Sequence, residues 1–276
     1  MRVEDVPEVH DLSVLTFEAL NASRGEPPEP RPDPELAHIR YRHLVTTDPG
    51  GAWVAEHDGS IVGCALALRR EDVWGLSLLV VRPDRQSSGT GGALLRRANE
   101  YAEGARGRIV MASLDPRALR AYHRLGLDVQ PALSATGTPK VSEPGGVREG
   151  DAGDIPFTAA VDRHVRGAAR GADIGALLEM RQTLLIAPER GYAVVQPGGR
   201  PRMLAAYDDD AASALLCAVL ARAEGEVTVD CLTAKQQWAI AVCVEAGLEL
   251  REGLTAIFTG GDVGPFTPYL PSGSFL

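Results

Sequence analysis

The sequence has few cysteines, no long apolar run and no excess of basic residues, and each absence narrows the classes of protein it can encode. The four cysteines, Cys64, Cys217, Cys231 and Cys243, form no CxxC pair and have no histidine at metal-ligand spacing, which argues against a zinc site. No apolar run approaches the roughly 18 residues of a membrane span, and the N-terminal residues lack a signal-peptide core. We therefore expect a cytoplasmic protein with buried free thiols and no membrane partner.

The charge balance is acidic. Lys and Arg total 28 against 37 Asp and Glu, which gives a formal net charge of −9. Non-specific nucleic-acid binding needs a basic face, so we expect no nucleic-acid partner. An acidic surface could attract amines, although solubility alone explains net acidity more simply. The 276 residues allow one large domain or two small ones, and the chain is compatible with a homodimer.

The N-terminal half has the pattern of alternating helices and strands. Apolar spacing predicts a short extended start and then a helix within 2–22, a hairpin of 52–56 and 61–68, a strand over 76–81, a helix over 90–103 and a strand over 108–112. Asp115-Pro116 is typical of a helix start and Leu125-Gly126 of a helix end. The proline-rich segment 23–34 is interpreted either as a loop that shapes a substrate site or as a tolerated insertion.

The pattern restarts after a segment rich in Pro, Gly, Ser and Thr, so we predict domains over 1–135 and 147–276 with a linker over 136–146. The second half is predicted to contain strands over 192–195 and 202–206, a helix over 209–223, a strand over 227–232, a helix capped by Thr233 and ending at Gly247, and a last strand over 254–258. An offset of 121 residues aligns the helices and strand of the two halves, which favours duplication over chance register. The apolar tail 264–276 is expected to dock on the folded protein.

The most informative segment is a strand, a turn and a helix over 78–95. The turn reads Gln86-x-x-Gly89-x-Gly91, where the glycines remove Cβ atoms at the point of closest ligand approach. It lacks the lysine of a nucleotide-hydrolysing loop and the third glycine of a dinucleotide-binding turn. Backbone amides of consecutive residues would converge at the positive end of the helix and form a phosphate cradle; these residues are Ser87, Ser88, Gly89, Thr90, Gly91 and Gly92.

These residues resemble the GNAT acyltransferase family. The family motif joins V-x-P on a strand to Q/R-x-x-G-x-G/A and a helix that begins with Leu-Leu, and it appears here as Val81-x-Pro83, the Gln86 turn and Leu94-Leu95. A second family element, A-x-x-x-Y-x-x-x-G-F on a capped helix, appears as Asp115, Ala118, Tyr122, Gly126 and Leu127, with Leu127 in place of the usual Phe. The resemblance covers about residues 1–135.

The resemblance implies an α/β (α+β) fold of two GNAT-like domains, each with a central mixed, mostly antiparallel sheet flanked by helices. It also implies an N-acetyltransferase that passes the acetyl group of acetyl-CoA, used as co-substrate without a metal, directly to the amine of a small molecule or peptide. The backbone of Leu79, Val80 and Val81 would meet the acetyl and pantetheine arm, and the Gln86–Gly92 turn would hold the pyrophosphate. Asp115 occupies the position of a family Asn that contacts CoA, but a helix cap explains it better. Tyr122 would protonate the leaving thiolate, the alternative being a core aromatic.

The second half departs from the motif. At the offset of 121, Gln86 falls on Tyr207, Gly89 on Asp210, Gly91 on Ala212 and Tyr122 on Cys243. Three carboxylates, Asp208 to Asp210, would repel a pyrophosphate, so we interpret this half as a degenerate copy that packs and shapes the substrate cleft.

The general base is not indicated by the sequence. Candidates are Glu18, Glu56, His57, Glu71 and Asp72. The missing base favours an alternative function, a non-catalytic acyl-CoA-binding sensor or regulatory module, whereas Tyr122 favours an enzyme.

Overall fold

The computed structural model describes residues 1–25, 31, 33–253 and 255–276. It divides into two compact units, the first formed by Met1–Arg69 and Trp74–Ala105 and the second by Arg70–Val73 and Arg106–Leu276. Both contain sheets flanked by helices, so the chain has the mixed α/β fold that the sequence predicts. None of the helices in these described residues is long and apolar enough to cross a membrane.

The first unit is a sheet in the order β1-β2-β3 with helices on both faces. Trp74 of β3 donates its indole N–H to the carbonyl of Ala98, 3.1 Å away, and so fixes α3 on one face. Arg40 of α2 donates to the carbonyl and hydroxyl of Ser77, which lies on the other face of β3 because side chains alternate along a strand. The elements of this unit are η1 (Val3–Asp5), α1 (Val6–Ser23), α2 (Pro34–Thr47), β1 (Ala52–His57), β2 (Ser60–Arg70), β3 (Val73–Val81), η2 (Pro83–Arg85) and α3 (Thr90–Glu100).

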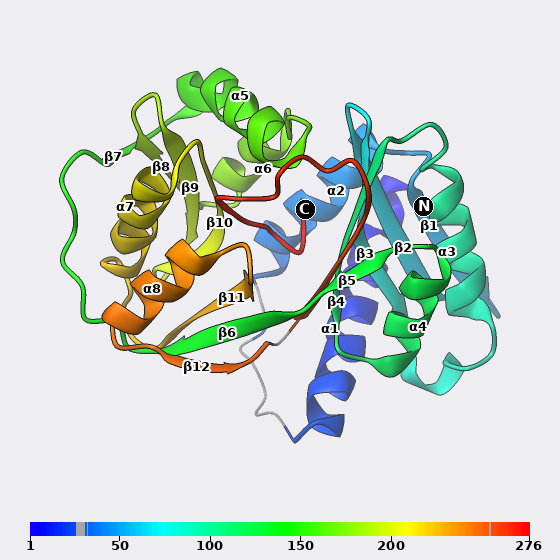
Figure 1. The fold of residues 1–276 in the computed structure, drawn as a ribbon. Coiled ribbons are helices and arrows are strands. Elements are labelled where there is room, and N and C mark those ends of the chain that lie inside the picture. Colours follow the sequence, from blue (N-terminus) through cyan, green and yellow to red (C-terminus); the bar gives the residue numbers. More distant parts are fainter. Residues whose placement is uncertain (26–30, 32, 254) are drawn as a thin grey trace. The chain divides into compact units, whose positions relative to one another are not determined.

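The second unit contains three groups of paired strands, in the orders β4-β13-β5, β11-β6-β12 and β14-β10-β9-β8-β7. In Figure 1, α7 and α5 lie against the last of these groups, in agreement with their contacts to β9 and β10. The elements of this unit are β4 (Gly107–Ser113), α4 (Pro116–Arg124), β5 (Asp128–Gln130), β6 (Ala132–Gly137), β7 (Arg148–Glu149), η3 (Ala152–Asp154), α5 (Ile155–Arg166), α6 (Asp173–Glu179), β8 (Thr183–Ala187), β9 (Gly191–Gln196), β10 (Arg200–Ala206), α7 (Asp209–Leu220), β11 (Val227–Thr233), α8 (Gln237–Glu245), β12 (Glu249–Glu252), β13 (Thr255–Gly261) and β14 (Tyr269–Leu270).

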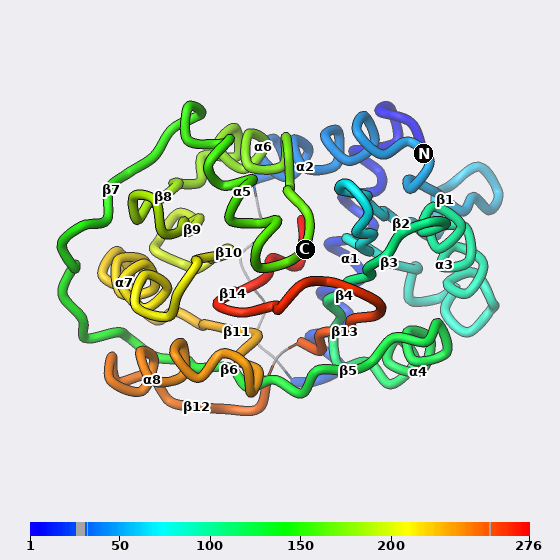
Figure 2. Tube along the Cα trace, turned by 45° about the horizontal axis from the view of Figure 1, so that its top comes forward, coloured from blue at the N-terminus to red at the C-terminus, as the bar shows by residue number. Residues whose placement is uncertain are grey.

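Two strands pair with partners from the other half of the sequence. Strand β13 lies between β4 and β5, antiparallel to both, and Figure 2 shows the three running together. Strand β6, from the earlier half, lies between β11 and β12. Each half therefore completes a group of strands whose other members come from the opposite half. The predicted domains over 1–135 and 147–276 stay a prediction.

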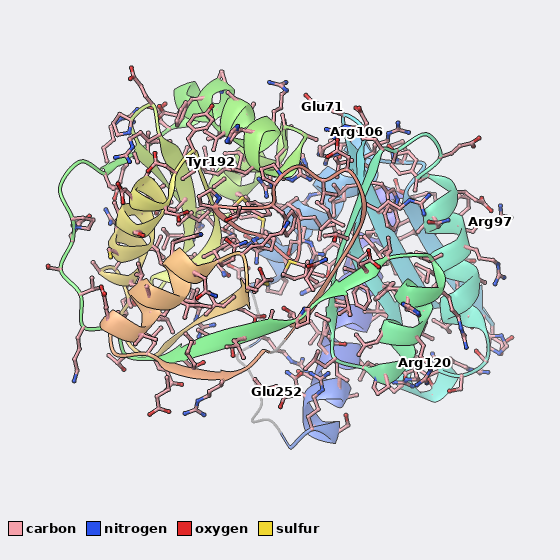
Figure 3. The ribbon with its side chains drawn as sticks, viewed as in Figure 1. Glu71, Arg97, Arg106, Arg120, Tyr192 and Glu252 are labelled. Carbon is pink, nitrogen blue, oxygen red and sulfur yellow. The ribbon has the colours of Figure 1, made fainter. Side chains whose placement is uncertain are left out.

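The core of the second unit includes a fully buried ion pair. Arg170 pairs with Asp162, and the hydroxyl of Tyr192, labelled in Figure 3, donates to Asp162 at 2.7 Å. Tyr269 of β14 also hydrogen-bonds Arg170, and β14 pairs with β10. Phe275, in the same C-terminal tail, has an exposed fraction of 0%. The prediction that the apolar tail docks on the folded protein is therefore confirmed.

Most predicted elements are present within a few residues of their expected bounds, with clear exceptions. Helices α2, α5 and α6 and strands β5, β6, β7, β8, β12 and β14 were not expected. The predicted cap at Thr233 is wrong: this residue ends β11, and Gln236 precedes the first turn of α8. The predicted loop over 23–34 includes residues 26–30 and 32, which lie outside the described residues.

Candidate functional site

The turn between β3 and α3 has open space above the first helical turn. Gly89 precedes the helix with φ 91°, in the left-handed region that favours glycine, and no described side chain caps α3. A Cβ atom added at Gly89 would meet nothing within 4 Å, and one at Gly91 would meet only Val81, at 3.5 Å. The start of α3 is therefore uncapped and sterically open at Gly89 and Gly91, as an anion site at the positive end of a helix requires.

Short polar contacts hold this turn in its conformation. The side-chain amide of Gln86 donates to the carbonyl of Val81, 3.1 Å away. The Ser88 hydroxyl donates to the carbonyl of Arg85 at 2.6 Å and lies 2.9 Å from the Thr90 hydroxyl. These bonds fix the turn without placing a carboxylate at the positive end of the helix.

The strand that leads into the turn is largely buried. Val80 and Val81 are buried and Leu79 is half-buried. The structure thus brings the predicted strand residues and the predicted turn residues together at one end of β3, whereas their contacts with acetyl-CoA stay predictions.

The second unit holds Tyr122 and Asp115 on α4. Asp115 accepts a hydrogen bond from the backbone N–H of Arg117 at 2.8 Å, so it does cap the helix, and it forms an ion pair with the Arg117 guanidinium at 2.6 Å. Tyr122 is 4% exposed. Burial, and to a lesser degree the negative charge of Asp115, raise the pKa of Tyr122 well above its usual value. The phenol is therefore protonated at neutral pH, as a proton donor must be.

The turn at the corresponding place in the second half is closed by a side chain. Asp208 accepts from the backbone N–H of Ala211 at 2.9 Å and caps α7. The Arg190 guanidinium pairs with this carboxylate and, with the cap bond, lowers the pKa of Asp208. A negative charge is therefore built into the position that is open at α3.

Of the candidate bases, Glu18 is half-buried and the other four are exposed, and four of the five have an acidic or basic partner. Glu18 pairs with Arg31, His57 with Asp58, Glu71 with Arg163 and Asp72 with Arg106. Glu56 is exposed near the end of β1. These contacts engage the four side chains in other electrostatic interactions. Among the residues that the structure describes, no three His, Cys, Asp or Glu side chains gather as a metal site would require.

Sequence reasoning missed an open pocket of about 590 Å³ beside α3. The Arg97 guanidinium, which Figure 3 shows on the outer side of α3, lies 5.5 Å from the Trp53 ring centre. No sequence pattern joins these residues, because β1 and α3 are brought together only by the fold. The lining residues are Trp53, Val54, Ala55, Thr90, Ala93, Leu94, Arg96, Arg97 and Glu100.

Residues 15–127 match the family model of the acetyltransferase (GNAT) family. This part of the chain is therefore a GNAT acetyltransferase domain, and such domains transfer an acyl group from acetyl-CoA. No curated protein sequence matches the chain.

Solved structures support the fold over nearly the whole length. A provisionally assigned acetyltransferase from Pyrococcus horikoshii superposes with a TM-score of 0.79 at 14% identity, covering 100% of this chain and 94% of its own. A GCN5-related N-acetyltransferase from Sphaerobacter thermophilus gives 0.57 at 16% identity, with 95% and 94% covered. A tandem GNAT protein from the clavulanic acid biosynthesis pathway gives 0.54 at 16% identity, with 94% and 95% covered. The fold predicted from the sequence is confirmed.

Proposed function

We propose that this chain is an N-acetyltransferase that transfers the acetyl group of acetyl-CoA to an amine of a small molecule or peptide. One observation carries the proposal: the first turn of α3 is open and uncapped behind Gly89, while the corresponding turn of α7 carries the carboxylate of Asp208. The contrast supports a single working acetyl-CoA site per chain.

The turn residues have a defined task in this proposal. The backbone amides from Ser87 to Gly92 would donate to the pyrophosphate, helped by the positive end of α3. The backbone of Leu79 to Val81 would align the pantetheine arm and the thioester. Gln86 would keep the turn in shape through its bond to Val81.

Tyr122 would supply the proton that completes the transfer. The amine nitrogen forms a bond to the thioester carbon, the carbon–sulfur bond breaks, and the thiolate takes a proton from the phenol. The amine loses a proton to a base that the sequence does not indicate, either directly or through water. A buried phenol with a raised pKa stays protonated until the thiolate forms.

A second candidate function is a non-catalytic acyl-CoA-binding sensor or regulatory module. It is favoured by the candidate bases, because Glu18, Glu71 and Asp72 form other ion pairs and His57 lies 3.2 Å from Asp58. Both functions use the same turn, so binding alone does not distinguish them.

Turnover distinguishes them. The protein is incubated with acetyl-CoA and a panel of polyamines, aminoglycosides and lysine peptides, and both free thiol and the mass of the amine are measured. We expect an acetylated amine and an equal amount of CoA. Tyr122→Phe should keep acetyl-CoA affinity and lower turnover by about 10²–10⁴, the usual worth of general acid catalysis. Binding without any acetylated amine would favour the sensor, and turnover of Tyr122→Phe within about threefold of wild type would remove Tyr122 from the mechanism.

A further inference from the structure

Tyr122 packs against a ring from the far end of the sequence. The ring centres of Tyr122 and Phe258 lie 5.4 Å apart at an interplanar angle of 64°, an edge-on arrangement that aromatic pairs prefer. Tyr122 is 4% exposed and Phe258 2% exposed. The Phe258 ring therefore limits the orientations that the phenol can adopt.

The backbone of Phe258 is held from both sides. Phe258 is paired with Val110 of β4 on one side and with Val129 of β5 on the other. These are the strands that immediately precede and follow α4, the helix that carries Tyr122. A shift of Phe258 would therefore require both ladders of hydrogen bonds to shift with it.

The same strand makes room for Leu127, which follows the C-terminal end of α4. A Cβ atom at Gly260 would lie 2.7 Å from a methyl carbon of Leu127, so the glycine makes room for this side chain. Leu127 stands where the GNAT motif has a Phe. The aromatic ring beside Tyr122 comes from β13, two residues before the glycine that Leu127 requires.

We propose that Phe258 is a positioning residue for Tyr122, so that the C-terminal half of the chain supplies a working component of the acyl-transfer site. This inference rests on the proposed role of Tyr122 as proton donor. A reacting group must be held closely, and a misplacement of about 1 Å can lower the rate roughly 100-fold. The ring of Phe258, fixed by two strand ladders, provides that restraint.

The test is a double-mutant cycle of Tyr122→Phe and Phe258→Leu. The rate of CoA release from acetyl-CoA is measured with the amine of the panel that reacts fastest. Phe258→Leu alone should lower kcat by about 10- to 100-fold, with the KM for acetyl-CoA unchanged within about twofold. In the Tyr122→Phe background the same substitution should change kcat by less than about twofold, because no phenol proton remains to be positioned.

Phe266→Leu is the matched control. Phe266 is also buried and packs edge-on against a tyrosine, Tyr269, with ring centres 4.9 Å apart. This control should lose stability in urea unfolding to a similar extent but keep kcat. Circular dichroism at the assay temperature confirms that every variant compared is folded.

The outcomes separate the two claims. The inference is wrong if Phe258→Leu lowers kcat by the same factor with and without the Tyr122 hydroxyl, or if Phe266→Leu lowers kcat equally. In either case Phe258 acts through stability, and the proposed role of Tyr122 is unaffected. If Tyr122→Phe alone leaves kcat unchanged, the proposed proton donor is wrong and the positioning role fails with it.

Discussion

Replacing Gly89 by glutamate places a carboxylate at the mouth of the proposed pyrophosphate site. A Cβ atom at this position meets no atom within 4 Å, so the side chain fits without displacing a neighbour. It would extend into the open space at the start of α3. The expected effect on acetyl-CoA is therefore electrostatic repulsion.

The size of the effect follows from Coulomb's law. Two unit charges about 5 Å apart near a protein surface repel by about 1–3 kcal/mol, depending on the local dielectric. This corresponds to a loss of affinity of about 5- to 150-fold. Added salt should reduce the loss, since the position is exposed to solvent. A non-glycine residue in the left-handed region also costs about 1–2 kcal/mol of conformational energy, so the variant should be less stable than wild type.

Gly59→Glu separates charge from backbone strain. Gly59 lies in the β1–β2 turn with φ 76°, and a Cβ atom there also meets nothing within 4 Å. Both variants should lose similar stability in urea unfolding. In titration calorimetry with CoA, only Gly89→Glu should lose affinity. Equal affinity of Gly89→Glu and wild type would refute the assignment of the pyrophosphate site.

Two further predictions concern stability. Asp162→Asn leaves the buried charge of Arg170 without its ionic partner and should cost about 3–5 kcal/mol in urea unfolding; a cost under about 1 kcal/mol would show that the pair is dispensable. Burial and the neighbouring His38 lower the pKa of His10 below 6.5. As the pH drops below 6.5, His10 of the unfolded chain binds a proton more readily than His10 of the folded chain. The free energy of unfolding therefore falls, by at most about 1.4 kcal/mol per pH unit. His10→Gln should weaken that fall between pH 7.5 and 5.5, and an identical pH profile would exclude His10 as its source.

The parts of the fold that could be predicted are those set by local sequence. Asp115-Pro116 shows the cap and first turn of α4 directly, and Asp58-Gly59 shows the β1–β2 turn. The offset of 121 places the start of α4, Pro116, on Gln237, where α8 begins. The expected cap at Thr233 failed because the chain continues as β11 to that residue before turning.

The parts that could not be predicted depend on distant partners. Strand β6 occupies a segment whose Pro, Gly, Ser and Thr content is typical of a linker, and its strand structure is stabilised by β11 and β12. Helix α2 was missed because its start, Asp33-Pro34, lies in the proline-rich segment that was interpreted as a loop. Likewise, nothing near Tyr122 in the sequence indicates Phe258, because the two rings meet only when β13 pairs between β4 and β5.

The number of CoA molecules bound per chain tests the central claim most directly. Native mass spectrometry and calorimetry of the full chain with CoA should give one molecule per chain. Gly89→Glu should reduce this occupancy at the same CoA concentration, and Gly59→Glu should not. Two molecules per chain, or one molecule with undiminished affinity in Gly89→Glu, would contradict a single site at the start of α3.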